Sequence, residues 1–511
     1  MTDWTDGYVT DVVYTYGYYP ELNPLRIKLA FLNAGLAFPE VGTACELGYG
    51  QGMSVSMHAA ASVTAWHGTD FNPAQAAFAM ELDAVSGAGA ALYDEAFDEF
   101  CGRLDLPAFD YIALHGIWSW ISDENRVIIV DFIRRKLKVG GVLYISYNTM
   151  PGWAAFAPMQ HLMKLQNDVF GQAGHSILKR IDSSIEFVQG LMAVNPLYAR
   201  ANPLIAGRIE KLNGQNRNYL AHEYFNRNWN AMHFSEVADW LLPAKVEYAC
   251  STHYLDHIDT LNLTQEQQAF MKEIPDPMFR QSVRDFMVNQ QFRKDYWVKG
   301  ARKLSALEQL EAWREQRVLL LTHRPDVSLK VSGALGEASM SEQVYNPLLD
   351  ALADHKPKTV GQLEQELKAN GISFAQLTES IIILSGSGNL SLVHYDVEIS
   401  KAKIRTEKLN AHLMGKSRAG NDIIYLASPV TGGGVVVGRF QQLFLLAMKQ
   451  GKKKPAEWAE VAWQILAMQG QSLVKEDKTM MTAEENLAEL TAQANTFFEK
   501  QLPIVKALQI A

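Results

Sequence analysis

The stretch ACELGYGQGMSVSMHAAAS, residues 44–62, decides the fold, because a short apolar run there leads into three closely spaced glycines. The glycines stand at positions 48, 50 and 52, and an alanine-rich segment follows them. An apolar run, a glycine turn and a helix in this order predict a strand that passes into a helix through a tight loop. Such glycines let the backbone approach a ligand closely, and the first N–H groups of the helix point toward it. The stretch therefore predicts a ligand-binding loop.

Residues 41–150 continue the alternation of short apolar runs with amphipathic segments. Strands are predicted at 43–48, 62–70, 90–94, 109–115 and 141–148, and helices at 51–61, 72–88 and 123–139, the last ending at Gly140 and Gly141. Strands that alternate with helices are typical of βαβ units in a parallel sheet covered on both faces. The predicted fold class is therefore α/β, with a Rossmann-like core.

The rest of the chain is expected to be mostly helical. We divide it into an N-terminal lead or lid (1–40), the core (41–155), a helical middle region with later sheet strands (156–330), a winged-helix domain (340–400) and a helical C-terminal domain (401–511). A strand is expected at 244–251 and a linker at 324–337. Three helices followed by a strand pair at 389–399 suggest the winged helix.

The bulk composition is that of an ordinary globular protein. The 511 residues are 48% hydrophobic and 20% charged, with a formal net charge of −9, which gives no general attraction to nucleic acid or to an anionic membrane. No run of eighteen apolar residues predicts a membrane span, and the N-terminus is not expected to be a signal peptide. Three widely spaced cysteines argue against disulfides or a cysteine-based zinc site. We expect a cytoplasmic protein without a metal.

Two carboxylates indicate which ligand the glycine loop binds. The spacing G-x-G-x-G differs from the G-x-G-x-x-G that places a pyrophosphate on a helix, and Glu46 beside the loop would repel that group. S-adenosylmethionine (AdoMet) has no phosphate and carries a sulfonium and an ammonium, which suit Glu46. Asp70, at the end of the second predicted strand, is placed to accept the ribose hydroxyls. The alternative is a tight turn followed by a helix N-cap, without a ligand.

Apolar residues at the ends of neighbouring strands are expected to flank the adenine. Ala96 and Phe97 follow the third predicted strand, and Phe71 could cover the other face of the base, although each is also compatible with core packing. The predicted cofactor-binding residues are Glu46, Gly48, Tyr49, Gly50, Gly52, Asp70, Phe71, Ala96, Phe97 and His115.

Several stretches resemble one bacterial family. FDYIALHGIWSWIS (109–122) and SYNTMPGW (146–153) are similar to signature stretches of class I AdoMet-dependent methyltransferases with a methyltransferase regulatory domain. Residues 14–36, 222–241 and 284–300 are also similar to members of that family, whereas Met150 and the sequence at 22–24 depart from its pattern. The best-known members are protein lysine methyltransferases that modify an outer-membrane protein. The resemblance implies AdoMet as cofactor and methyl transfer as the reaction.

Methyl transfer is an in-line displacement that requires an aligned nucleophile and the exclusion of water. A lysine acceptor must first lose a proton, which near pH 7 costs roughly 4.6 kcal/mol from an unperturbed pKa of about 10.4. Tyr14, Tyr16, Tyr18 and Tyr19 could form an aromatic lid, although each could equally be a core residue. The residues predicted at the acceptor site are Tyr18, His115, Trp118, Tyr147, Asn148 and Trp153.

Other functions stay open at this point. The acceptor could be a glycan or a small-molecule hydroxyl or amine instead of a protein lysine. A winged helix could also make the chain a DNA-binding regulator with a ligand-sensing domain, but residues 373–389 contain no Lys or Arg to meet phosphates. We therefore expect a protein substrate, no nucleic acid and no membrane insertion, with a homodimer as a possible assembly.

Overall fold

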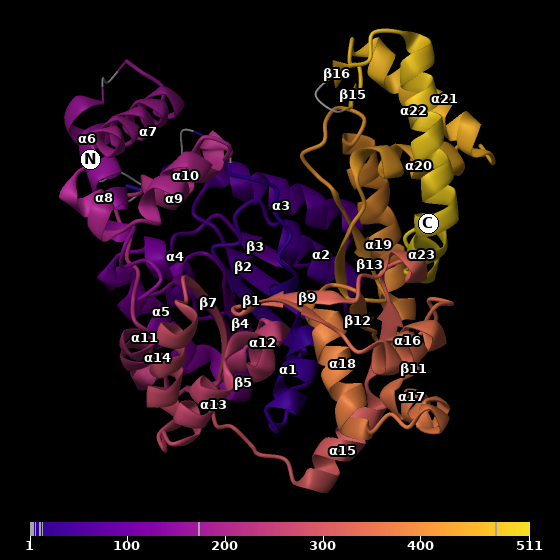
Figure 1. The fold of residues 1–511 in the computed structure, drawn as a ribbon. Coiled ribbons are helices and arrows are strands. Elements are labelled where there is room, and N and C mark those ends of the chain that lie inside the picture. The colour runs from indigo at the N-terminus through magenta and orange to yellow at the C-terminus, as the bar shows by residue number, and fades with distance from the viewer. Residues whose placement is uncertain (1–4, 6, 10–11, 13, 172–173, 476–477) are drawn as a thin grey trace.

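A seven-stranded sheet forms the centre of the computed structural model, which describes residues 5, 7–9, 12, 14–171, 174–475 and 478–511 (Figure 1). Its strands are β1 (Thr43–Leu47), β2 (Ala65–Thr69), β3 (Ala91–Tyr93), β4 (Phe109–Leu114), β5 (Leu137–Asn148), β6 (Glu247–Ser251) and β7 (Phe292–Val298). Their order is β3-β2-β1-β4-β5-β7-β6. The first five are parallel, whereas β7 runs antiparallel to both of its neighbours. The expected α/β fold with a Rossmann-like core is confirmed.

Alternate residues of the central strands enter two separate cores. Ala44 and Tyr111 pack in one cluster with residues of α1 (Ile27–Asn33), α2 (Met53–Ala61) and α3 (Pro73–Ser86). Their neighbours Cys45 and Ile112 pack in another with residues of α4 (Phe97–Gly102), α5 (Asp123–Lys136) and α11 (Phe234–Leu241). Successive side chains of a strand point to opposite faces, so this division shows that both faces of the sheet are covered.

The start of β5 differs from the prediction. The helix ends at Lys136 and the strand begins at Leu137, before the glycine pair that was expected to end the helix. Leu137 pairs with Phe109 and Val142 with Tyr111, so the register shifts within the strand. Gly140 has φ +81° at this irregularity. The two glycines therefore belong to a bulge in the strand.

The middle region is helical, as expected, and returns twice to the sheet. Its helices are α6 (Ala157–Phe170), α7 (Ile177–Ala193), α8 (Leu197–Ala201), α9 (Ile205–Leu212), α10 (Arg217–Tyr224), α11, α12 (Asp259–Asn262), α13 (Gln265–Lys272), α14 (Pro277–Val288) and α15 (Ala306–Glu315), with the 3₁₀ turns η4 (Leu242–Ala244) and η5 (Tyr254–His257). The strand expected at 244–251 is β6, and β7 is an addition to the prediction. The N-terminal lead contributes η1 (Pro20–Leu22) and η2 (Pro24–Arg26) before α1.

Two predictions between residues 324 and 400 are wrong. The expected linker contains η6 (Arg324–Asp326) and a hairpin of β9 (Lys330–Gly333) and β10 (Gly336–Ser339). The expected strand pair at 389–399 contains one strand, β12 (Leu390–Leu392), which pairs with β8 (Arg317–Leu320), and then the start of a helix. The remaining elements are α16 (Glu342–Ala351), β11 (Lys358–Thr359), α17 (Val360–Glu366), η7 (Lys368–Asn370) and α18 (Phe374–Gly386). The winged helix stays a prediction.

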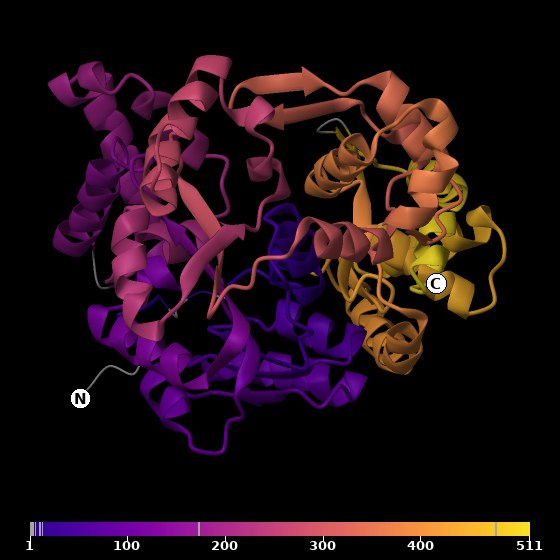
Figure 2. The ribbon, with the colours of Figure 1, turned by 90° about the horizontal axis from the view of Figure 1, so that it is seen from below.

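The C-terminal region packs on the core through its first helix. The long helix α19 (Asp396–Lys416) contacts α2 and α3, and the hairpin of β13 (Tyr425–Ser428) and β14 (Gly433–Val436) contacts α2. The other elements are α20 (Arg439–Lys449), α21 (Pro455–Met468), β15 (Val474–Lys475), β16 (Lys478–Thr479), α22 (Ala483–Thr496), the π-helical η8 (Phe497–Gln501) and α23 (Leu502–Ala507). Figures 1 and 2 show this region on one side of the molecule and α6–α10 on the other. None of the described helices is long and apolar enough to cross a membrane.

Candidate active site

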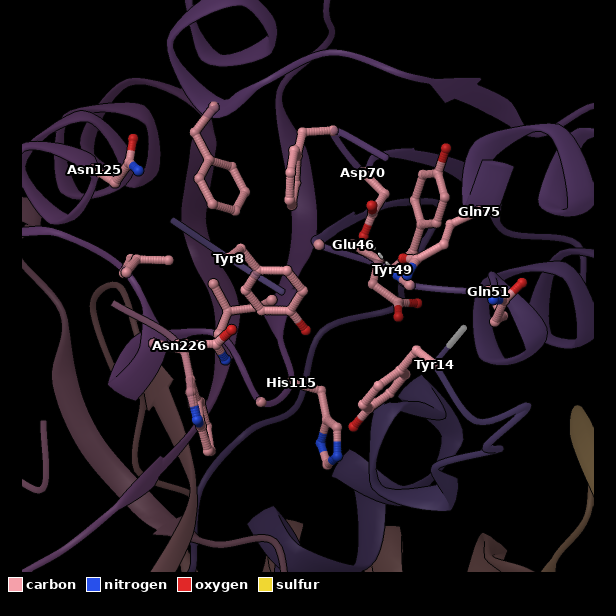
Figure 3. Close-up of a pocket in the computed structure, with 18 of the residues that line it drawn as sticks. Tyr8, Tyr14, Glu46, Tyr49, Gln51, Asp70, Gln75, His115, Asn125 and Asn226 are labelled. Atoms are coloured by element: carbon pink, nitrogen blue, oxygen red, sulfur yellow. Dashed lines mark hydrogen bonds between the residues drawn. The ribbon is translucent and has the colours of Figure 1, made fainter. Parts of the chain in front are cut away.

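A pocket lies at the carboxyl ends of the parallel strands, where the loops after β1, β2, β3 and β4 meet (Figure 3). All of the predicted cofactor-binding residues except Gly52 line it, namely Glu46, Gly48, Tyr49, Gly50, Asp70, Phe71, Ala96, Phe97 and His115. Gly52 is the residue before α2, and it turns the chain into that helix with φ +71°. The strand ends thus bring together residues that are up to 69 positions apart in the sequence.

The glycine loop depends on backbone conformations that other residues rarely adopt. Gly48 and Gly50 have φ angles of +71° and +58°. A Cβ atom on Gly48 would overlap the side chain of Ile117, which lines the pocket from the loop after β4. The backbone N–H of Gly50 donates a hydrogen bond of 2.8 Å to Oδ2 of Asp70. The loop after β1 is therefore held in shape by the carboxylate that follows β2.

Two buried carboxylates define the charge of the pocket. Asp70 is 6% exposed, and its Oδ1 accepts the N–H of Asn72 at 3.0 Å. Glu46 is 3% exposed, and its Oε2 has no hydrogen-bond partner among the described residues. Burial raises the pKa of Glu46 to about 8, with the charge of Asp70 adding to the effect, and raises the pKa of Asp70 to about 7. A cationic ligand would stabilise the ionised form of both groups.

His115 lines the pocket as a neutral side chain. Its Nδ1 lies 2.7 Å from the hydroxyl of Tyr144, and its ring is tilted by 31° against that of Tyr19, with the centroids 3.8 Å apart. Burial lowers the pKa of His115 to about 4. At neutral pH the imidazole therefore carries no charge that would repel a sulfonium.

The N-terminal segment forms one wall of the pocket, and sequence reasoning identified only part of it. Tyr8, Tyr14 and Tyr19 line the pocket, and Figure 3 shows the ring of Tyr14 pointing toward His115. The segment is tied to the chain after α10, because the N–H of Val9 donates to Oδ1 of Asn226 at 2.9 Å. The expected lid residues 1–4, 6, 10–11 and 13 lie outside the described residues.

Other lining residues had no separate signal in the sequence. They are Thr5, Gly7, Thr15, Gly17, Gln51, Gln75, Glu95, Gly116, Ile117, Trp120, Ile121, Asn125, Asn226 and Asn228. The lining residues between 116 and 125 follow β4 directly. Most of them belong to the stretch 109–122, which resembles the methyltransferases. Their position after a central strand was the signal that could have identified them.

Five of the six residues predicted at the acceptor site do not line the pocket, and His115 is the exception. Trp118 is fully buried, and its carbonyl accepts hydrogen bonds from Arg126. The hydroxyl of Tyr147 donates to Oδ2 of buried Asp295 at 2.9 Å. Trp153 packs in the helical middle region, with Arg208 4.1 Å above its ring. Trp118, Tyr147 and Trp153 therefore pack in the interior, because their strands and turns direct them away from the pocket.

Asn148 and Tyr18 have other surroundings. The Nδ2 of Asn148 donates to Oε1 of Glu223 at 3.5 Å, just outside the pocket lining. The hydroxyl of Tyr18 lies 3.1 Å from Nε2 of His58 in α2, and a Cβ atom on Gly433 would overlap that hydroxyl. Tyr16 packs on Phe78 of α3. Tyr18 thus joins the N-terminal lead, α2 and the C-terminal hairpin, instead of serving the acceptor.

We expect the substitution Tyr18→Phe to lower the free energy of unfolding by about 1 kcal/mol, because it removes one buried hydrogen bond. The dissociation constant for AdoMet should stay within about twofold of the wild-type value, since Tyr18 does not line the pocket and its hydroxyl contacts His58. Urea denaturation and calorimetry measure the two quantities, and Tyr16→Phe is the matched control. Weaker cofactor binding with unchanged stability would contradict this assignment.

Known proteins match this chain over one domain and over its full length. Residues 216–299 match the family model of a predicted methyltransferase regulatory domain. The protein sll1526 of Synechocystis is 39% identical over 514 aligned residues, which cover 99% of this chain and 100% of the relative. The structure of PKMT2 from Rickettsia typhi in complex with AdoHcy superposes with a TM-score of 0.70 at 15% identity, over 98% of this chain and all of the other.

The chain belongs to the family of sll1526. The family assignment is based on the full-length match to sll1526, and the class I methyltransferase fold is based on the structural similarity to PKMT2. The predicted class I methyltransferase fold and the predicted methyltransferase regulatory domain are thereby confirmed. The regulatory domain begins with α10 and ends at β7.

Proposed function

We propose that this methyltransferase binds AdoMet in the pocket and transfers its methyl group to the side chain of a protein lysine. The charge of the pocket carries the cofactor assignment. None of the described residues that line it is Lys or Arg, whereas Glu46, Asp70 and Glu95 are carboxylates. Glu95 is paired with Arg103 at 2.6 Å, so Glu46 and Asp70 remain to face the ligand. Such a pocket disfavours any phosphate and favours the cationic, phosphate-free AdoMet.

Each part of AdoMet has suitable neighbours. Asp70 would accept the ribose hydroxyls, and Phe71 with Ala96 and Phe97 would enclose the adenine. The free Oε2 of Glu46 would accept from the ammonium group. The loop after β1 brings backbone groups close to the amino-acid part of the ligand, since its glycines have no side chains. The methyl group would then lie toward His115 and the N-terminal tyrosines.

The proposal of a protein lysine acceptor rests on the resemblance of residues 109–122 and 146–153 to a family whose best-known members are protein lysine methyltransferases, and on the extensive accessory regions. Aromatic rings near the methyl group suit an alkylammonium. A glycan or small-molecule acceptor is the alternative. For a DNA-binding regulator, α18 offers no Lys or Arg for phosphates. We further propose that the enzyme is cytoplasmic and forms a homodimer. Analytical ultracentrifugation measures its oligomeric state.

Incubation of the protein with methyl-labelled AdoMet and a whole-cell extract tests the acceptor. We expect label in protein bands, and hydrolysis of those bands should give methylated lysine. Label in the small-molecule or glycan fraction would favour the alternative, and no transfer at all would contradict the proposed activity. The variant Asp98→Ala, with an exposed carboxylate on α4, serves as a control that should label the same bands.

The affinity for AdoMet should increase as the pH rises from about 6 to about 8. Glu46 and Asp70 have pKa values of about 8 and about 7 in the free protein, so both are partly protonated at neutral pH. A cation lowers both pKa values, so binding releases protons and is favoured by higher pH. Calorimetry in buffers of different ionisation enthalpy measures the release. Glu46→Gln should remove most of it, and an affinity that falls with pH would contradict the assignment.

A further inference from the structure

A carboxylate that the cofactor does not use lies next to the pocket. Glu223 is near the end of α10, in the regulatory domain, and its side chain is half-buried. The Nε1 of Trp120, which lines the pocket, donates to the backbone carbonyl of Glu223 at 3.1 Å. Burial raises the pKa of the Tyr8 and Tyr14 hydroxyls, and the nearby carboxylate of Glu223 adds a smaller contribution to both. Glu223 therefore lies next to the pocket, beside Trp120 and close to the N-terminal tyrosines.

The polar groups next to the Glu223 carboxylate are neutral donors, and no positively charged side chain of the described residues forms an ion pair with it. Asn148 donates to Oε1 at 3.5 Å, and the hydroxyl of Tyr219 is close to the carboxylate. Glu223 forms no salt bridge with any described residue. The guanidinium of Arg208, which acts on Glu223 electrostatically, lies over the rings of Trp153 and Phe156. An oriented, half-buried carboxylate without a counter-ion, ringed by tyrosines, suits an incoming alkylammonium.

We propose that Glu223 binds the ammonium group of the acceptor and removes its proton before methyl transfer, with Asn148 holding its carboxylate in place. This inference rests on the proposed function and specifies the acceptor side of the same site. The carboxylate takes one proton from R–NH₃⁺ and becomes a carboxylic acid. The freed lone pair of the amine forms the N–C bond, while the C–S bond breaks and its electrons stay on sulfur. The products are R–NH₂CH₃⁺ and neutral S-adenosylhomocysteine.

The surroundings of Glu223 suit this proton transfer. Burial raises the pKa of Glu223 to about 7, against the opposing effects of Asn148, Tyr219 and Arg208. A base with a pKa near the operating pH combines a sufficient ionised fraction with a sufficient driving force. The tyrosines that face it are Tyr8, Tyr14, Tyr219 and Tyr224, whose pKa values are all raised, mainly by burial, so they stay neutral in this range. The guanidinium of Arg208 also acts on it. We thus expect kcat at saturating AdoMet to rise as Glu223 ionises.

The first test uses saturation-transfer NMR to measure the binding of n-butylammonium to the protein saturated with S-adenosylhomocysteine. Binding is expected for the wild type and for Glu210→Gln, an exposed glutamate on α9, and should weaken about tenfold or more in Glu223→Gln. AdoMet affinity and the thermal unfolding midpoint should be the same in all three proteins, which excludes a folding defect. Equal binding in Glu223→Gln, or none in the wild type, would overturn the assignment.

The second test measures kcat against pH with poly-L-lysine as acceptor. Glu223→Gln should lose about a hundredfold in kcat together with the acid limb of the profile, and Glu223→Asp should recover part of both. A purely structural role would lower activity equally at every pH, which would overturn the inference. If the wild type and Glu223→Gln transfer methyl groups to protein at equal rates, the role of Glu223 is overturned but the proposed function is not. No transfer by the wild type would instead count against the proposed function.

Discussion

Asp70→Ala is expected to weaken AdoMet binding about a hundredfold or more, equivalent to about 2.7 kcal/mol. The carboxylate accepts the N–H groups of Gly50 and Asn72, so its removal loosens the glycine loop as well as removing the proposed partner of the ribose. A hydrogen bond to a charged group contributes about 1.5–3 kcal/mol, and this substitution removes at least two such bonds. Calorimetric titration with AdoMet measures the effect.

The control for this substitution is Asp98→Ala, because Asp98 is exposed on α4 and does not line the pocket. Its affinity for AdoMet should equal that of the wild type. Thermal unfolding of Asp70→Ala separates a local loss of binding from loss of the fold. Unchanged affinity in a folded Asp70→Ala protein would remove the second strand from the cofactor site.

Gly52→Ala is expected to lower the free energy of unfolding by about 2–5 kcal/mol. Gly52 has φ +71°, a left-handed conformation that costs a non-glycine residue about 1–2 kcal/mol. A Cβ atom at this position would also overlap the Cβ of Ala79 in α3, and overpacking of a core costs about 1–3 kcal/mol. Urea denaturation measures the sum, together with the m-value as a check on two-state unfolding.

Gly87→Ala is the matched control, because Gly87 has φ +67° but a Cβ atom added there would meet no atom of the described residues within 4 Å. This variant isolates the backbone cost, which is about 1–2 kcal/mol. The difference between the two variants then reports the close packing of α2 on α3. A loss in Gly52→Ala no larger than that in Gly87→Ala would show that the two helices can separate without cost.

The core and the cofactor side of the pocket could be predicted because local patterns determine them. Glu46 and Asp70 each stand at the end of an apolar run, and parallel strands place their carboxyl ends at one edge of the sheet. Sequence position within each βαβ unit was therefore enough to bring these two carboxylates together. The glycines between them are required by φ angles that the turn from β1 to α2 imposes.

The acceptor side could not be predicted from local pattern, because contacts between distant segments decide it. Tyr18 was expected at the acceptor, but it bonds His58 and meets Gly433, more than 400 positions away. Glu223 approaches the pocket only because α10 packs near Asn148 at the end of β5. A tyrosine or a glutamate in such a segment carries no periodic signal that would distinguish a lining residue from a core or surface residue.

The misplaced boundaries have similar causes. Gly140 and Gly141 look like a helix end, and the bulge that uses them is visible only when β5 is paired with β4. The polar composition of residues 324–337 suggests a linker, but β9 and β10 pair with each other there. Sheet pairing thus overrides composition at both places.

A calorimetric titration of the wild-type protein with AdoMet, run in parallel with NAD, tests the central claim most directly. A pocket lined by Glu46 and Asp70 and by no described Lys or Arg should bind AdoMet saturably, one molecule per chain, and should give no measurable binding of the pyrophosphate ligand. Absence of AdoMet binding, or tighter binding of NAD, would contradict the account.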